Sequence, residues 1–150
     1  MFFRLMNTAD ALRRQEACLD AWHADLSDRE KTAVLDAMWE TKTPRYSETL
    51  LKIARGQDSS AVRAQAITVL TGIGVSHGAA VLVPMLSSDP DCQVKRQLLA
   101  LFRAYPAPEA LPAIDQLLGD QTGPCVRWPV DFLDRAREAR AAIVAANPAR

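Results

Sequence analysis

The sequence predicts an all-α protein built from repeated helical hairpins, and two observations carry this prediction. The segments 61–70, 93–102 and 125–134 read AVRAQAITVL, QVKRQLLALF and CVRWPVDFLD, so a valine followed by a base recurs every 32 residues. A repeat period of about 20–50 residues is typical of stacked supersecondary units. No segment alternates apolar and polar residues over strand length between turn signals, so no sheet is expected.

Two helices precede the regular repeats and form a degenerate first hairpin. The hairpin covers 8–42, and its helices cover about 8–25 and 28–41. Thr8 is suited to cap the first helix, and Ser27 and Glu30 have capping-box spacing at the start of the second. This hairpin departs from the repeat, because Glu30 and Lys31 stand where the other hairpins have a valine and a base.

Three regular repeats are predicted from 46 to 146, each with a helix A and a helix B, and the whole chain 1–150 forms one domain. The A helices are expected at about 47–55, 78–87 and 109–119. The first B helix is expected at about 61–73, the second from just after Cys92 to about 104, and the last from just after Cys125 to about 146. Pro84 lies inside the second A helix, where we expect a kink. If the last helix begins at Val126, Pro129 lies in its first turn and is tolerated. If the helix begins at Pro124, Pro129 is expected to bend it.

Composition excludes some classes of function. Lys plus Arg equal Asp plus Glu, 18 each, so no field of one sign attracts nucleic acid or an anionic membrane. No apolar run approaches membrane-spanning length, and the first residues lack the pattern of a secretory signal. The three cysteines, Cys18, Cys92 and Cys125, show no CxxC spacing, so we expect reduced thiols in a cytoplasmic protein.

Helical periodicity divides the B helices into three stripes of side chains. The first is predicted to be core, and its members are Val62, Ala66, Val69, Val94, Leu98, Leu101, Val126, Val130 and Leu133. The second is apolar in the first three hairpins, with members Leu35, Met38, Ile67, Leu70, Leu99 and Phe102. In the last repeat this stripe becomes Asp131 and Asp134, which we interpret as a polar C-terminal cap. The alternative is that these two side chains merely face solvent.

The third stripe varies from repeat to repeat, as a recognition surface would, and we call it the recognition stripe. Its candidate partner-binding residues are Trp128, Phe132, Arg96, Arg103, Arg135, Trp39, Asp36 and Thr68. Aromatic and arginine side chains are frequent anchors of protein interfaces. The alternative for Trp128 is a place in the core.

The bases that follow the valines are expected to be structural. Arg63, Lys95 and Arg127 can each pair with an acid in the preceding turn, from the set Asp58, Asp89, Asp91 and Asp120. A ladder of bases for a phosphate backbone is the alternative, and the surrounding acids argue against it. No catalytic or metal-binding motif occurs, and neither of the two histidines, His23 and His77, has a paired ligand in the sequence, so no enzyme, metal or cofactor is expected.

Residues 49–74, 78–105 and 109–133 resemble the HEAT repeat, in the short form of the phycobilisome-lyase HEAT-like group. The resemblance implies a right-handed α-α solenoid that presents the B helices on a concave face. It is nearly silent on function. The expected function is a cytoplasmic, monomeric scaffold that binds another protein on that face. The alternatives are nucleic-acid binding or base repair, and a bilin-lyase-like chaperone that would use the cysteines.

Overall fold

The structure, a computed structural model, describes residues 2–74, 78–120 and 122–148, with side chains from residue 9 onward. Across these ranges the chain forms α-helices and short 3-10 helices, and it forms no strand. The prediction of an all-helical protein is therefore confirmed for the part of the chain that is described. His77, the second of the two histidines considered above, lies outside the described residues.

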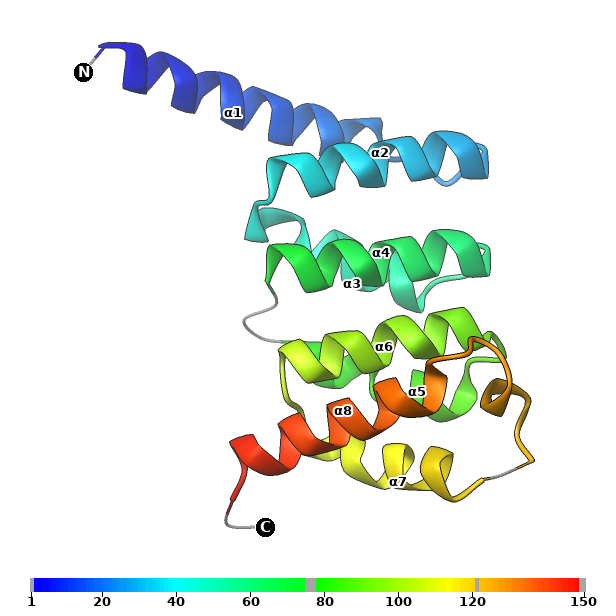
Figure 1. The fold of residues 1–150 in the computed structure, drawn as a ribbon. Coiled ribbons are helices and arrows are strands. Elements are labelled where there is room, and N and C mark those ends of the chain that lie inside the picture. Colours follow the sequence, from blue (N-terminus) through cyan, green and yellow to red (C-terminus); the bar gives the residue numbers. More distant parts are fainter. Residues whose placement is uncertain (1, 75–77, 121, 149–150) are drawn as a thin grey trace.

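Four helices lie in one row, each packed against the next: α2 (Asp28–Thr41), α4 (Ser60–Ile73), α6 (Cys92–Ala104) and α8 (Phe132–Ala146) (Figure 1). The returning segments form a second row, which consists of α1 (Phe2–Ala21), α3 (Ser47–Arg55), η2 (Ala79–Leu82), α5 (Met85–Ser88) and α7 (Leu111–Gly119). Three further 3-10 helices lie at the connections: η1 (Pro44–Tyr46), η3 (Pro108–Ala110) and η4 (Pro124–Val126). Helices α3, α5 and α7 pack on α4, α6 and α8 respectively.

Side-chain caps start three of the four helices in the first row. Ser27 forms the predicted capping box, since its hydroxyl accepts from the N–H of Glu30 and the Glu30 carboxylate accepts from the N–H of Ser27, both at 3.2 Å. Ser59 and Asp91 cap α4 and α6 in the same manner, by accepting from the N–H of the third residue that follows. These three caps are 32 residues apart, so the repeat of the sequence is a repeat of helix starts.

The fourth helix start departs from this pattern, which corrects the predicted last repeat. Position 123 is equivalent to the caps but holds a glycine, which has no side chain to accept a bond. Pro129 would then fall inside a helix beginning at 124, where its ring meets the preceding turn and its missing N–H leaves a carbonyl unpaired. The chain therefore makes only η4 and a turn before α8 begins at Phe132.

Two other predicted helices differ from the structure. Helix α1 covers Phe2–Ala21 and not 8–25, so Thr8 lies within the helix and does not cap it. No glycine or proline upstream of Thr8 stops the helix there. The predicted helix 78–87 is not kinked but divided into η2 and α5, because Pro84 cannot donate a helical hydrogen bond.

The core lies between the two rows and contains most of the side chains predicted for it. Both apolar stripes of α4 and α6 are fully buried, together with Leu35 and Met38 of α2. The last repeat is again the exception, because Val126 is half-buried and Val130 is 84% exposed. The buried side chains of α8 are instead Phe132, Ala136, Ala139 and Ile143. Their i, i+4, i+7 and i+11 spacing gives α8 its own apolar stripe.

Two buried ion pairs join consecutive hairpins. The Lys31 ammonium contacts the Asp58 carboxylate, and the Arg63 guanidinium contacts the Asp89 carboxylate. Arg63 also donates from Nε to the carbonyl of Asp58, at 3.0 Å. These pairs correct the prediction in one respect, because each base reaches the acid in the following turn and not the preceding one. Lys31 is thus the equivalent of Arg63, and it lies 32 residues before it.

Candidate functional site

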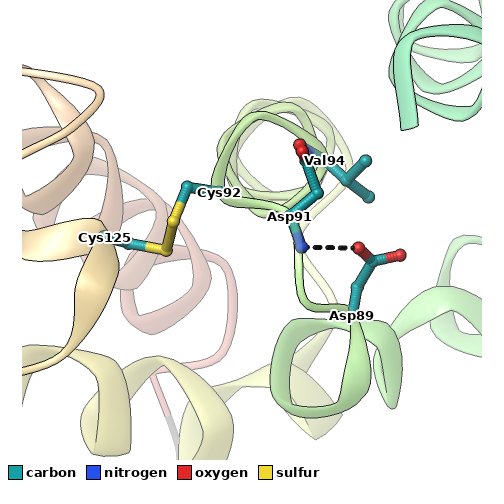
Figure 2. The surroundings of a disulfide bond; sticks show 5 residues. All are labelled: Asp89, Asp91, Cys92, Val94 and Cys125. Carbon is teal, nitrogen blue, oxygen red and sulfur yellow. Dashed lines mark hydrogen bonds between the residues drawn. A yellow bond between two sulfur atoms is a disulfide. The ribbon is translucent and has the colours of Figure 1, made fainter.

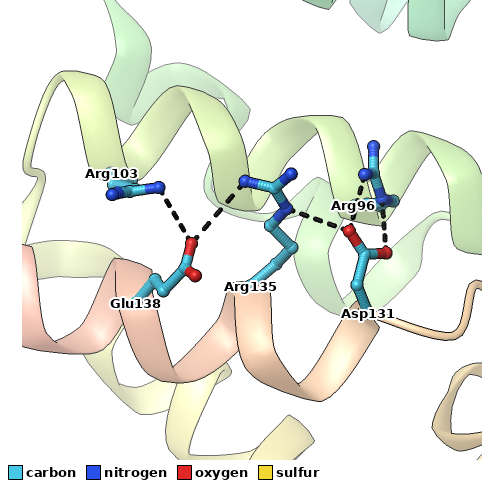
Figure 3. Close-up of polar contacts among 5 residues, drawn as sticks. All are labelled: Arg96, Arg103, Asp131, Arg135 and Glu138. Carbon is cyan, nitrogen blue, oxygen red and sulfur yellow. Dashed lines mark hydrogen bonds and ion pairs between the residues drawn. The ribbon is translucent and has the colours of Figure 1, made fainter.

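One face of α6 holds the segment between α7 and α8 at two points. Cys92 and Arg96 are four residues apart, so their side chains lie on the same face of the helix. Cys92 forms a disulfide with Cys125, with the two Cα atoms 5.4 Å apart (Figure 2). Arg96 donates from Nε and Nη2 to the two carboxylate oxygens of Asp131, at 2.8 and 2.7 Å (Figure 3). We call residues 125–131 the bridged loop.

The disulfide corrects the expectation of reduced thiols for two of the three cysteines. Cys92 begins α6 and Cys125 lies in η4, and packing of α6 against α8 brings the two elements together. Cys18 is the free cysteine among the described residues, half-buried in α1. The expectation of a cytoplasmic location rested on reduced thiols, so the disulfide removes that premise.

The bridged loop turns two large apolar side chains toward solvent. Trp128 is 64% exposed and Val130 is 84% exposed, whereas Pro129 between them is buried. The neighbouring Arg127 is exposed as well. Trp128 is therefore not a core residue, which was the alternative interpretation of this side chain.

Phe132 was predicted beside Trp128 on the recognition stripe, and this prediction is wrong. Phe132 is 1% exposed and belongs to the core. The two aromatic residues would share a face only if they lay on one helix. Because α8 begins at Phe132, the helical spacing does not extend back to Trp128.

A network of charged side chains links α6 to α8 beside the bridged loop (Figure 3). Arg103 donates to Glu138 at 2.9 Å, and Arg135 bonds to Asp131 at 3.1 Å and lies 3.6 Å from Glu138. The predicted residues Arg96, Arg103 and Arg135 are thus brought together. Each one is also engaged by a carboxylate, so none of them is a free cation.

Asp131 faces inward along this network, which corrects its interpretation as part of a C-terminal cap. Its carboxylate bonds back to α6 through Arg96 and does not face outward from the end of the array. Asp134 is exposed and pairs with Arg137 one turn further along α8. The bonds from Arg96, and then those from Arg135, hold the pKa of Asp131 well below its ordinary value.

The other predicted site residues lie at the opposite end of the row, on α2 and α4 (Figure 1). The Trp39 ring covers Gly72 so closely that a Cβ at Gly72 would overlap it. Asp36 accepts from the side-chain amide of Gln65 at 2.8 Å. Thr68 donates to the carbonyl of Ala64 within its own helix. These three residues therefore lie on other helices than the bridged loop, and each contacts its own or the neighbouring helix.

Other kinds of site have little support in the described part of the chain. No group of three or more His, Cys, Asp or Glu side chains within it is arranged to hold a metal ion. A depression with a volume of about 410 Å³ lies between the turns at 56–58 and 88–90. None of the predicted site residues lines it. In the same ranges, every helix is too short or too polar to cross a membrane.

Comparison of the chain with protein-family models, with curated proteins and with solved structures found no match.

The ion pair between Arg96 and Asp131 makes a pH-dependent contribution to stability. Because the folded pKa of Asp131 is lowered, this contribution is present in full above the ordinary aspartate pKa of about 3.9 and is lost as pH falls through the lowered value. We therefore expect the melting temperature of the wild type to exceed that of Asp131→Asn at pH 7. This difference in melting temperature should stay constant down to about pH 5 and become smaller below about pH 4. Thermal melts of both proteins across this pH range test the prediction. A difference in melting temperature that grows as the pH falls below about 4 would contradict it.

Proposed function

We propose that the protein is a non-catalytic scaffold of the HEAT-like solenoid type, which binds another protein through the bridged loop and the adjoining surface of α6 and α8. The observation that carries this proposal is the exposure of Trp128 and Val130 on a loop held at both ends by α6. A partner that covers an exposed tryptophan gains binding free energy, because each Å² of apolar surface removed from water contributes about 25 cal/mol.

The two links to α6 also favour binding by limiting the motion of the loop. A loop that is ordered before binding loses less conformational entropy when the partner arrives. The disulfide at Cys125 and the paired hydrogen bonds at Asp131 supply this order in the free protein. Trp128 lies between them and has few side-chain torsions to immobilise, so it suits the role of a central anchor.

The charge of this surface indicates the chemistry of the partner. Four arginines, namely Arg96, Arg103, Arg127 and Arg135, lie here with two carboxylates, those of Asp131 and Glu138, which leaves an excess of two positive charges. Asp134 is balanced by its own partner, Arg137. We infer a protein segment in which apolar side chains cover Trp128 and Val130 and neighbouring carboxylates face the arginines.

The solenoid part of the proposal rests on the repeated geometry of the first three helices in the row. Each of α2, α4 and α6 begins with a side-chain cap at a 32-residue interval, and each packs on the next. The ion pairs at Lys31 and Arg63 join the first hairpin to the second and the second to the third in equivalent ways. Contact of each unit with its neighbours alone is the pattern expected of a repeat array.

Fluorescence anisotropy of labelled short peptides tests the docking function. Peptides with apolar residues flanked by Asp and Glu are titrated with the full chain, beside matched peptides in which Lys replaces each acid. We expect the acidic peptides to bind more tightly. Trp128→Ala should weaken them about 30-fold, which corresponds to about 2 kcal/mol for an interface anchor.

The matched control is Val81→Ala, which changes another exposed apolar side chain, 45% accessible, on η2. This variant should bind as wild type does. Equal binding of acidic and basic peptides, or affinity that is unaffected by Trp128→Ala, would overturn the proposal. Salt-dependent binding of DNA or RNA in a gel-shift assay, with no peptide bound, would favour the nucleic-acid alternative instead.

A further inference from the structure

We propose that the Cys92–Cys125 disulfide controls the bridged loop, so that its reduction by a dithiol releases the Trp128 surface and its re-oxidation restores it. The control of partner binding rests on the docking function proposed above. The release of the loop itself rests only on the contacts of the loop and can be measured without a partner.

The disulfide is one of the two links between the loop and α6. The other is the ion pair between Arg96 and Asp131, at the far end of the loop. The remaining backbone hydrogen bonds of this loop are local, since the N–H groups of Val126, Phe132 and Arg135 donate to the carbonyls of Gly123, Pro129 and Asp131. When the disulfide is cut, the end of the loop at Cys125 has no further hydrogen bond to α6 among the described residues.

The surroundings of the two sulfur atoms suit thiol–disulfide exchange. Cys92 is the more exposed partner and is the first residue of α6, where the helix N-terminus stabilises a thiolate. Cys125 lines a small cavity of about 60 Å³ together with Lys95. Asp120 lines the same cavity, so a thiolate released at Cys125 has one cation and one carboxylate in its surroundings, and the group that favours exchange is the helix N-terminus at Cys92.

The exchange is balanced in two steps. One thiolate of the dithiol attacks Sγ of Cys92, which forms a mixed disulfide, breaks the bond to Cys125 and releases Cys125 as a thiolate beside Lys95. The second thiolate of the dithiol then attacks the reagent's own sulfur in the mixed disulfide and releases Cys92. The dithiol is oxidised to a cyclic disulfide, and its two protons are taken up by the two cysteine thiolates.

Tryptic cleavage after Arg127 reports on the release, because a protease needs an extended segment that a doubly linked loop cannot supply. The full chain is reduced with dithiothreitol, freed of the reagent under nitrogen and digested briefly, and products are identified by mass spectrometry. Cleavage after Arg55, which is exposed at the end of α3, is the internal control. We expect cleavage after Arg127 to accelerate about tenfold on reduction, with Arg55 unchanged.

Two further samples sharpen this comparison. The double variant Cys92→Ser with Cys125→Ser should be cleaved rapidly after Arg127 with or without dithiothreitol, and wild type re-oxidised with oxidised glutathione should return to slow cleavage. Equal rates after Arg127 in the two redox states would overturn the proposal. Acceleration at Arg55 as well would overturn it too, since the disulfide would then support the whole fold and not the loop.

The peptide titration, repeated in both redox states, separates this inference from the docking function. Weaker binding to the reduced chain supports control by the disulfide. Equal binding in the two states overturns that control and leaves docking intact. A chain that binds no peptide in either state overturns docking, and the cleavage rates then decide whether the loop is released.

Discussion

Asp89→Ala is expected to lower the free energy of unfolding by about 3 kcal/mol, because it leaves the guanidinium of Arg63 buried without its carboxylate. The side chains of Asp89 and Arg63 are 5% and 14% exposed, so the pair is largely removed from solvent. Asp89 also accepts from the N–H of Asp91, which positions the residue that caps α6 (Figure 2). Urea denaturation followed by circular dichroism measures the loss.

Two comparisons show whether the cost comes from the unpaired charge. Asp134→Ala removes an exposed carboxylate of the pair with Arg137 and should cost no more than about 1 kcal/mol. Joint replacement of Arg63 by Met and Asp89 by Leu should recover most of the stability, because neither partner is then left as an unpaired buried charge. A double variant as unstable as Asp89→Ala alone would show that the loss of stability comes from the altered geometry of the turn and not from the unpaired charge.

Phe132→Ala is expected to cost about 3–5 kcal/mol, whereas Trp128→Ala should change the free energy of unfolding by less than about 0.5 kcal/mol. Phe132 is 1% exposed and its loss leaves a cavity between α8 and its neighbours, but Trp128 is 64% exposed. The same urea experiment measures both variants.

The contrast between the two aromatic residues tests where α8 begins. If the 32-residue period continued unbroken, both side chains would lie one turn apart on the same helical face and would cost similar amounts. Similar losses for the two variants would therefore contradict a helix start at Phe132. Normal stability of Trp128→Ala is also what makes this variant suitable for the peptide titrations.

Much of the fold follows from local signals that the sequence displays. The capping box at Ser27 acts within one helical turn and predicts the start of α2 correctly, and the turns before the repeated valine-base pairs predict the starts of α4 and α6 to within about a residue. The apolar stripes of these helices were assigned from periodicity, and the structure buries them. A signal for the exception was present as well, since position 123 holds glycine where the earlier hairpins have a cap.

The candidate site was predictable only in part. The sequence pointed to Trp128 and to three arginines, but it placed Phe132 beside them and described Asp131 as an outward cap. Both errors follow from extending a helix through Pro129. The partners of Arg96 and Cys92 lie 35 and 33 residues away, and no local rule identifies contacts at such separations.

Taken by itself, the sequence determined the all-helical class, the first three helix starts in the row and the apolar faces that form the core, because capping and periodicity act between residues a few positions apart. Tertiary structure alone decided which base meets which acid, which cysteines join and which aromatic side chain remains in solvent. Those outcomes depend on distances between separate helices. Such distances are set only when α6 and α8 pack together and hold the bridged loop between them.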